Sequence, residues 1–204
     1  MKNLVGLKFI GDLSLEDADI LVKYGKLSRS ILEFGVGGST QILSQCRPDK
    51  LITVDTDSNW IDLTKSRLDQ IQDRSECVFY MYNEYPAMIA DQMFDMIFVD
   101  GITHLRRDFA INTWKNLSEG GVMVFHDTRR PGDFKNAALV AQQYSNEVSL
   151  IEVNAAAENG MSSNITVIHK KAYQPYVNWN FVEGKPGWSY GSKNKDQPLW
   201  QFTP

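Results

Sequence analysis

Two aspartates and two histidines stand just beyond apolar runs, and these residue types can move protons or hold a metal ion. Asp100 directly follows one apolar run, and His104 comes four residues later. His126 and Asp127 follow another apolar run in the same way. An imidazole accepts protons near neutral pH, which makes His104 the first candidate for a general base. For His126, a buried structural role satisfied by backbone groups stays open beside a catalytic one.

Asp100 and Asp127 should lie side by side if their apolar runs form neighbouring strands. Two like charges that close need a proton or a counter-ion. A magnesium-like ion with oxygen ligands would meet that need, and His126 or His104 would add a ligand. The sequence therefore predicts a catalytic cluster of Asp100, His104 and Asp127, and a metal site of Asp100, Asp127 and His126. Thr128, the next residue, would be a weaker ligand.

A glycine-rich turn follows the apolar run that ends at Phe34 and leads into a helix capped by Ser39 or Thr40. Glycines let a backbone approach a ligand closely and adopt positive φ. Turns of this kind serve dinucleotides, flavins or other ligands, or they simply allow tight packing. The residues expected around a ligand are Glu33, Gly35, Val36, Gly37, Gly38 and Ser39.

Asp55 and its neighbour Thr56 end the next apolar run, about twenty residues after the turn. A carboxylate there can accept hydrogen bonds from both hydroxyls of a ribose. The alternative for Asp55 is a helix cap before Ser58. The alternative for Glu33 is a structural carboxylate near a helix N-terminus.

Alternating strands and helices should position these residues. Strands are predicted at 30–34, 51–54, 78–82, 96–99, 122–125, 149–153 and 165–169, and helices at 14–25, 39–46, 58–72, 84–91, 105–117 and 133–146. Ser14 and Asp17 form a plausible cap for the first helix. The pattern predicts an α/β fold: a Rossmann-like, doubly wound, mainly parallel seven-stranded sheet with an antiparallel final strand.

The chain is expected to divide into three parts. Residues 1–27 form a helical segment that packs on the domain, residues 28–171 form the ligand-binding domain, and residues 172–204 form an irregular aromatic tail. A lid, an arm in a homodimer and a wrap over the domain all stay open for the tail. The basic pairs Arg106-Arg107 and Arg129-Arg130 are interpreted as solvated, with contact to an anionic substrate group left open.

Together these features resemble the class I S-adenosylmethionine-dependent methyltransferases over about residues 28–170. The resemblance lies in the glycine turn at Glu33–Ser39, in Asp55, in the fourth strand and in the closing hairpin. Within that group, the chain is similar to the methyltransferase domain 24 subfamily. That subfamily has a D-G-x-x-H stretch, here Asp100–His104, and a G-G-x-x-x-x-H-D stretch, here Gly120–Asp127.

The resemblance implies S-adenosylmethionine as the cofactor, held by the turn, Asp55, Thr56 and Asp100, with Glu33 near its ammonium group. It implies methyl transfer to a small-molecule hydroxyl, on a sugar or natural product. Catechol-type relatives use a metal that lowers the pKa of such a hydroxyl. They carry an Asp-Asn pair after the fifth strand, whereas this chain has Asp127-Thr128.

Two other functions stay in view. One is a binding module that holds S-adenosylmethionine or a partner without catalysis. The other is a nicotinamide-dependent oxidoreductase, which usually has a third turn glycine where this chain has Thr40.

Composition limits the partners of the chain. It has 204 residues, 43% of them hydrophobic, which suits one folded domain. Its net charge of -4 argues against nucleic acid and anionic membranes as partners. The sequence shows no bilayer-spanning apolar run and no signal peptide at its start. We therefore expect a cytoplasmic protein, and the resemblance implies a small-molecule partner.

Overall fold

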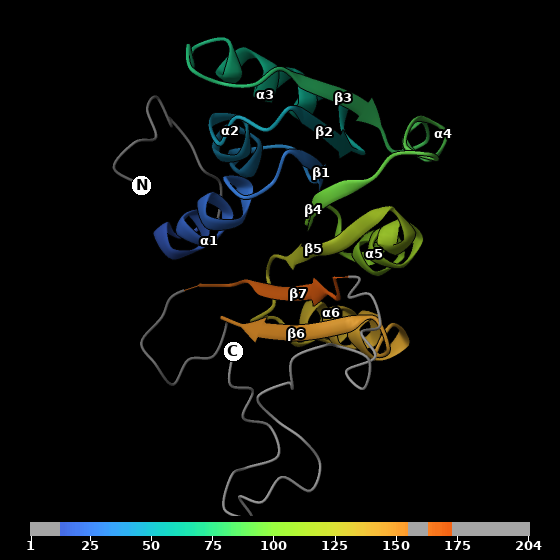
Figure 1. The fold of residues 1–204 in the computed structure, drawn as a ribbon. Helices are drawn as coiled ribbons and strands as arrows, with labels where there is room; N and C mark the ends of the chain where they lie inside the picture. The colour runs from blue at the N-terminus through green and yellow to red at the C-terminus, as the bar shows by residue number, and fades with distance from the viewer. Residues whose placement is uncertain (1–12, 155–162, 173–204) are drawn as a thin grey trace, which may run out of the picture. The chain divides into compact units, whose positions relative to one another are not determined.

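Seven strands form one sheet across residues 13–154 and 163–172, the residues that this computed structural model describes. The strands are β1 (Ser30–Phe34), β2 (Lys50–Asp55), β3 (Cys77–Met81), β4 (Phe94–Val99), β5 (Leu117–Phe125), β6 (Val148–Val153) and β7 (Thr166–Lys170). Their order in the sheet is β3-β2-β1-β4-β5-β7-β6 (Figure 1). Strands β1 to β5 pair in parallel, and β7 is antiparallel to both β5 and β6. The predicted Rossmann-like sheet with an antiparallel final strand is confirmed.

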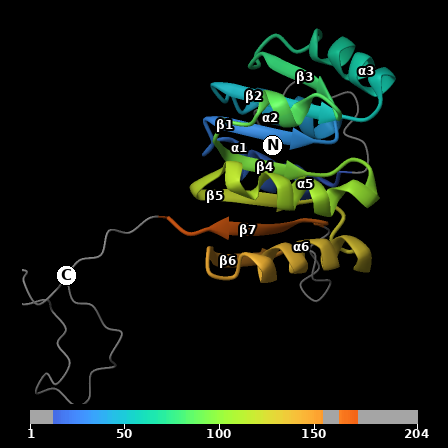
Figure 2. The same ribbon diagram turned by 90° about the vertical axis from the view of Figure 1, so that its right-hand side faces the viewer.

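Helices cover both faces of this sheet, as the views in Figures 1 and 2 show. The helices are α1 (Leu15–Gly25), α2 (Gly38–Gln45), α3 (Ser58–Leu68), α4 (Tyr85–Met88), α5 (Arg106–Thr113) and α6 (Pro131–Gln143). Helices α1 and α2 share one apolar core with alternate strand residues, and α4, α5 and α6 share the other. Neighbouring strand residues point to opposite faces, so each strand contributes to both cores.

The first helix begins where the sequence predicts. The Oγ of Ser14 accepts a hydrogen bond from the Asp17 amide at 3.1 Å, and Asp17 Oδ2 accepts one from the Ser14 amide at 2.9 Å. This reciprocal pair is a capping box, which satisfies two amide groups that the helix leaves without partners. Leu21 and Tyr24 of α1 are buried in the core shared with α2.

Two predicted boundaries around β5 are wrong. The strand begins at Leu117, five residues before the apolar run, and the predicted helix 105–117 is α5 with a 3₁₀ turn at each end, η1 (Thr103–Leu105) and η2 (Trp114–Asn116). Gly120 and Gly121 break the apolar run that would have marked the strand. Pairing with β4 holds this weak segment in the sheet, across a shift of register. Tertiary pairing therefore outweighs the local propensity.

Two further parts of the prediction concern the ends of the chain. The aromatic tail predicted at 172–204 lies outside the described residues except for Ala172, and the N-terminal segment is described from residue 13. Within the described ranges, no helix combines the length and the apolar character needed to cross a membrane.

Candidate active site

The strand order reverses between β1 and β4, because the chain proceeds from β1 to β2 and β3 on one side and from β4 to β5 on the other. In open α/β sheets, ligands bind at such a switch point, beyond the carboxyl ends of the strands. The glycine turn follows β1, Asp55 ends β2, Asp100 follows β4, and His126 and Asp127 follow β5. The predicted site residues therefore gather beyond the carboxyl ends of the parallel strands.

The turn after β1 requires glycine. Gly35 has a φ of +91°, and a Cβ there would lie 2.4 Å from the backbone nitrogen of Gly101. Gly101, after β4, has a φ of +74° itself. These φ values are positive, a conformation that residues with a Cβ atom rarely adopt. The two glycines let the loops after β1 and β4 touch, which brings Asp100 beside the turn.

Glu33 is fully buried beneath this turn. Its carboxylate accepts hydrogen bonds from Ser39 Oγ at 2.5 Å and from Thr40 Oγ1 at 2.8 Å. Burial raises the pKa of Glu33 to about 7, although these hydroxyls act in the opposite direction. These contacts join β1 to the first turn of α2. They match the alternative that Glu33 is a structural carboxylate near a helix N-terminus. The predicted cap residue is wrong: Gly37 is the N-cap of α2, and its amide donates to Thr40 Oγ1.

Asp55 holds the loops together from the β2 side. Its Oδ2 accepts a hydrogen bond from the Val36 amide at 2.8 Å, and its Oδ1 accepts from the Thr56 and Asp57 amides at 2.6 and 3.0 Å. The alternative of Asp55 as a helix cap is wrong, because Asp57 caps α3 through the Asn59 amide. Asp55 is partly exposed, at the place where a ribose would bind in the predicted arrangement.

A buried arginine lies among the aspartates. The side chain of Arg106 is 5% exposed, and its Nη2 lies 2.6 Å from Asp100 Oδ1. Its Nη1 lies 2.9 Å from Asp127 Oδ2 and 3.2 Å from Asp133 Oδ1. Nε and Nη2 both donate to the Gly101 carbonyl. The solvated role predicted for Arg106 is therefore wrong.

The sequence did carry a signal for this residue. Arg106, Phe109, Ala110 and Thr113 are the buried residues of α5, at the spacing of one helix face. Arg106 thus stands where the helical period places a core residue. The three carboxylates that make its burial tolerable come from different segments, and no sequence pattern links them.

Asp127 is buried and is surrounded by donors. Besides Arg106, it is contacted by Arg130 Nη1 at 2.8 Å and by Asn164 Nδ2 at 2.9 Å. Its backbone has a φ of +61°, a conformation that aspartate tolerates better than most residues. Asn164, which precedes β7, was not anticipated from the sequence. Thr128 is also buried, and its hydroxyl donates to the Asn164 carbonyl.

His126 is buried between two carboxylates rather than satisfied by backbone groups. Its Nδ1 lies 3.2 Å from Asp100 Oδ2, and its Nε2 lies 3.6 Å from Asp17 Oδ2. Burial alone would lower the pKa of His126, but the two carboxylates outweigh it and raise that pKa to about 10. The same contact, with backbone amides, holds the pKa of Asp17 well below its usual value despite burial. Helix α1 is thereby coupled to the site.

The predicted metal ligands Asp100, His126 and Asp127 do lie together, with ligand atoms within 4.8 Å of one another. The carboxylate oxygens of Asp100 and Asp127 already have protein partners, however. Arg106 contacts both carboxylates. A hard cation would need those same oxygens. The residues therefore do not fit a divalent ion in this arrangement.

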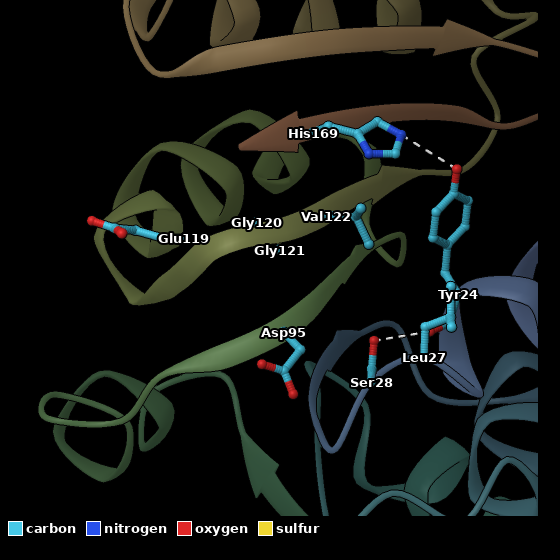
Figure 3. Close-up of a pocket in the computed structure, with 9 residues that line it drawn as sticks. All are labelled: Tyr24, Leu27, Ser28, Asp95, Glu119, Gly120, Gly121, Val122 and His169. Carbon is cyan, nitrogen blue, oxygen red and sulfur yellow. Dashed lines mark hydrogen bonds between the residues drawn. The ribbon is translucent and has the colours of Figure 1, made fainter. Parts of the chain in front are cut away.

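His104, the predicted base, is exposed in the turn η1, two residues before Arg106. A separate pocket of about 300 Å³ lies near the amino ends of β1 and β4 and contains none of the predicted site residues (Figure 3). On the wall of this pocket, the hydroxyl of Tyr24 lies 3.3 Å from Nε2 of His169.

Comparisons with known proteins agree with this arrangement. Residues 32–128 match a family model described as a methyltransferase domain. An O-methyltransferase from Bacillus cereus, solved with S-adenosylhomocysteine, is similar in structure, with a TM-score of 0.60 and 19% identity over 83% of this chain and 86% of that chain. The Streptomyces achromogenes O-methyltransferase of tomaymycin synthesis, solved with S-adenosylmethionine, has a TM-score of 0.60 and 18% identity over 78% and 82%. No curated protein matches significantly in sequence.

Proposed function

We propose that this chain is a class I methyltransferase, which transfers the methyl group of S-adenosylmethionine to a hydroxyl oxygen of a small molecule. The observation that carries the proposal is the meeting of the glycine turn, Asp55 and Asp100 at the switch point of the sheet. The similar structures solved with S-adenosylmethionine or its product support the choice of cofactor.

The cofactor would lie across the carboxyl ends of β1, β2 and β4. The backbone of the turn would approach it closely, and Asp55 and Thr56 would accept hydrogen bonds from the ribose hydroxyls. Asp100 would lie near its methionine part, and Glu33 would act on it from beneath the turn. The cofactor residues proposed here are Glu33, Gly35, Val36, Gly37, Gly38, Ser39, Asp55, Thr56 and Asp100.

S-adenosylmethionine supplies an electrophilic methyl carbon when bound and leaves as S-adenosylhomocysteine. The chain contributes alignment, because holding the acceptor oxygen in line with the methyl carbon makes the displacement effectively unimolecular. His104 takes the proton of the acceptor hydroxyl, and its exposure suits a base that meets a substrate from solvent. Asp100 and Asp127 shape the acceptor side of the crevice. The acceptor is a hydroxylated sugar or natural product.

Replacing Asp55 with alanine should weaken binding of S-adenosylhomocysteine by roughly tenfold to a hundredfold, because charge-assisted hydrogen bonds to the ribose are lost. Titration calorimetry measures this loss. Asp57→Ala is the matched control: it removes a helix cap in the same loop, costs about 1 kcal/mol of stability and should leave affinity unchanged. Equal losses of affinity in both variants would show that Asp55 acts only on loop structure.

Replacing His104 with alanine should slow methyl transfer by about a hundredfold or more and leave affinity for S-adenosylhomocysteine within about twofold. The rate is measured as release of S-adenosylhomocysteine with a panel of catechols and sugars. Thr103→Ala, an exposed change in the same turn, should keep the normal rate. Cofactor binding without turnover on any acceptor would favour the non-catalytic binding module, and failure to bind the cofactor would refute the proposed function.

A further inference from the structure

The cluster after β4 and β5 already contains the positive charge that a metal would bring. Two cationic side chains, Arg106 and Arg130, face the carboxylates of Asp100 and Asp127. Carboxylate oxygens of Asp100 and Asp127 lie within 4.8 Å of each other, so both groups need nearby positive charge to stay ionised together. Additional positive charge from a divalent ion would therefore meet repulsion rather than unneutralised carboxylates.

The guanidinium is also fixed in place. Its Nε and Nη2 donate to the Gly101 carbonyl at 3.0 and 2.8 Å, while Asp133 of α6 lies on its Nη1 side. Asp100, Asp127 and Asp133 approach it from three different segments. Withdrawing Arg106 to admit a metal would break these contacts and leave buried carboxylates unpaired, which is strongly unfavourable.

Both carboxylate oxygens of Asp127 already have protein partners. Its Oδ2 is shared by Arg106 and Arg130, and its Oδ1 accepts from Asn164. The hydroxyl of Thr128, the next residue, is in hydrogen bonds with Asn164 and Thr166. Asp100 is the accessible member, with a side chain that is 21% exposed.

We propose that the guanidinium of Arg106 takes the place of a divalent metal in this chain, so that methyl transfer proceeds without one. Arg106 is a positioning residue: it holds Asp100 at the edge of the crevice and keeps Asp127 buried beneath it. Arginine suits this role because its planar fork contacts several carboxylates at once and stays charged. The inference rests on the proposed methyltransferase function.

The first test is metal binding to the full chain, which needs neither cofactor nor acceptor. Paramagnetic resonance with Mn²⁺ at millimolar concentration should show no saturable site, and a chelator should change the rate of methyl transfer by less than about twofold. Saturable Mn²⁺ binding that Asp127→Asn abolishes would overturn the proposal. Calorimetry with S-adenosylhomocysteine on the same sample tests the proposed function separately, since that binding does not depend on the metal result.

The second test changes the guanidinium. Arg106→Gln frees oxygens of Asp100 and Asp127 and should create a saturable Mn²⁺ site, whereas Arg107→Gln, at the exposed neighbour, should not. Arg106→Lys retains the charge and should also bind no Mn²⁺, which keeps the test decisive if the glutamine variant fails to fold. A folded Arg106→Gln protein without Mn²⁺ binding, or Mn²⁺ binding by Arg106→Lys equal to that of Arg106→Gln, would overturn the proposal.

Discussion

Replacing Gly35 with alanine should destabilise the domain by at least about 3 kcal/mol and abolish binding of S-adenosylhomocysteine. The added Cβ would lie 2.4 Å from the Gly101 nitrogen and 2.8 Å from its Cα, both of them backbone atoms. Because neither can move alone, the loops after β1 and β4 would separate, and φ at +91° would add strain. Urea unfolding and calorimetry measure the two effects.

Gly132→Ala provides the matched control for this prediction. Gly132 lies in the first turn of α6, where an added Cβ meets nothing within 4 Å. Alanine is the better helix former, so the control should be neutral or more stable by up to about 1 kcal/mol. If Gly35→Ala were as stable and as able to bind as Gly132→Ala, the contact between the two loops would not organise the site.

Replacing His126 with glutamine should cost about 3 to 5 kcal/mol of unfolding free energy near neutral pH, because Asp17 and Asp100 lose the cation between them. The pKa of His126 is raised from 6.5 to about 10 in the folded chain. A base whose pKa is raised by folding contributes its full stabilisation at pH values below its pKa in the unfolded chain. It loses that stabilisation as the pH rises through its pKa in the folded chain. The difference between wild type and variant should therefore be largest below pH 6.5 and shrink as the pH rises toward 10.

Chemical unfolding of both proteins across this pH range measures that change. His169→Gln is a suitable control, since His169 also contacts a carboxylate, Glu152 at 2.8 Å, but is partly exposed. Its loss should cost less than about 1 kcal/mol, as is usual for exposed pairs. A difference for His126→Gln that stayed constant with pH would contradict a protonated His126 in the folded chain.

Local pattern was sufficient to predict the framework of this protein. Apolar runs indicated the five parallel strands, because a buried parallel strand needs a continuous apolar run, and a polar turn between two further runs indicated the antiparallel pair β6 and β7. The capping pair Ser14 and Asp17 and the glycine turn at Gly35 were predictable for the same reason: each depends on backbone geometry that a few neighbouring residues determine. The start of β5 was not, because it depends on pairing with β4.

The sequence by itself determined the succession of strands and helices along the chain and the glycine turn. It also determined the candidate residues Asp55, Asp100, His126 and Asp127. Only the tertiary structure decided what neutralises the last three. Arg106 contacts aspartates from three segments, and Asp17 reaches His126 from a helix more than a hundred residues earlier. Charge pairing in a buried site depends on distances across the fold, and residue spacing along the chain carries no record of those distances.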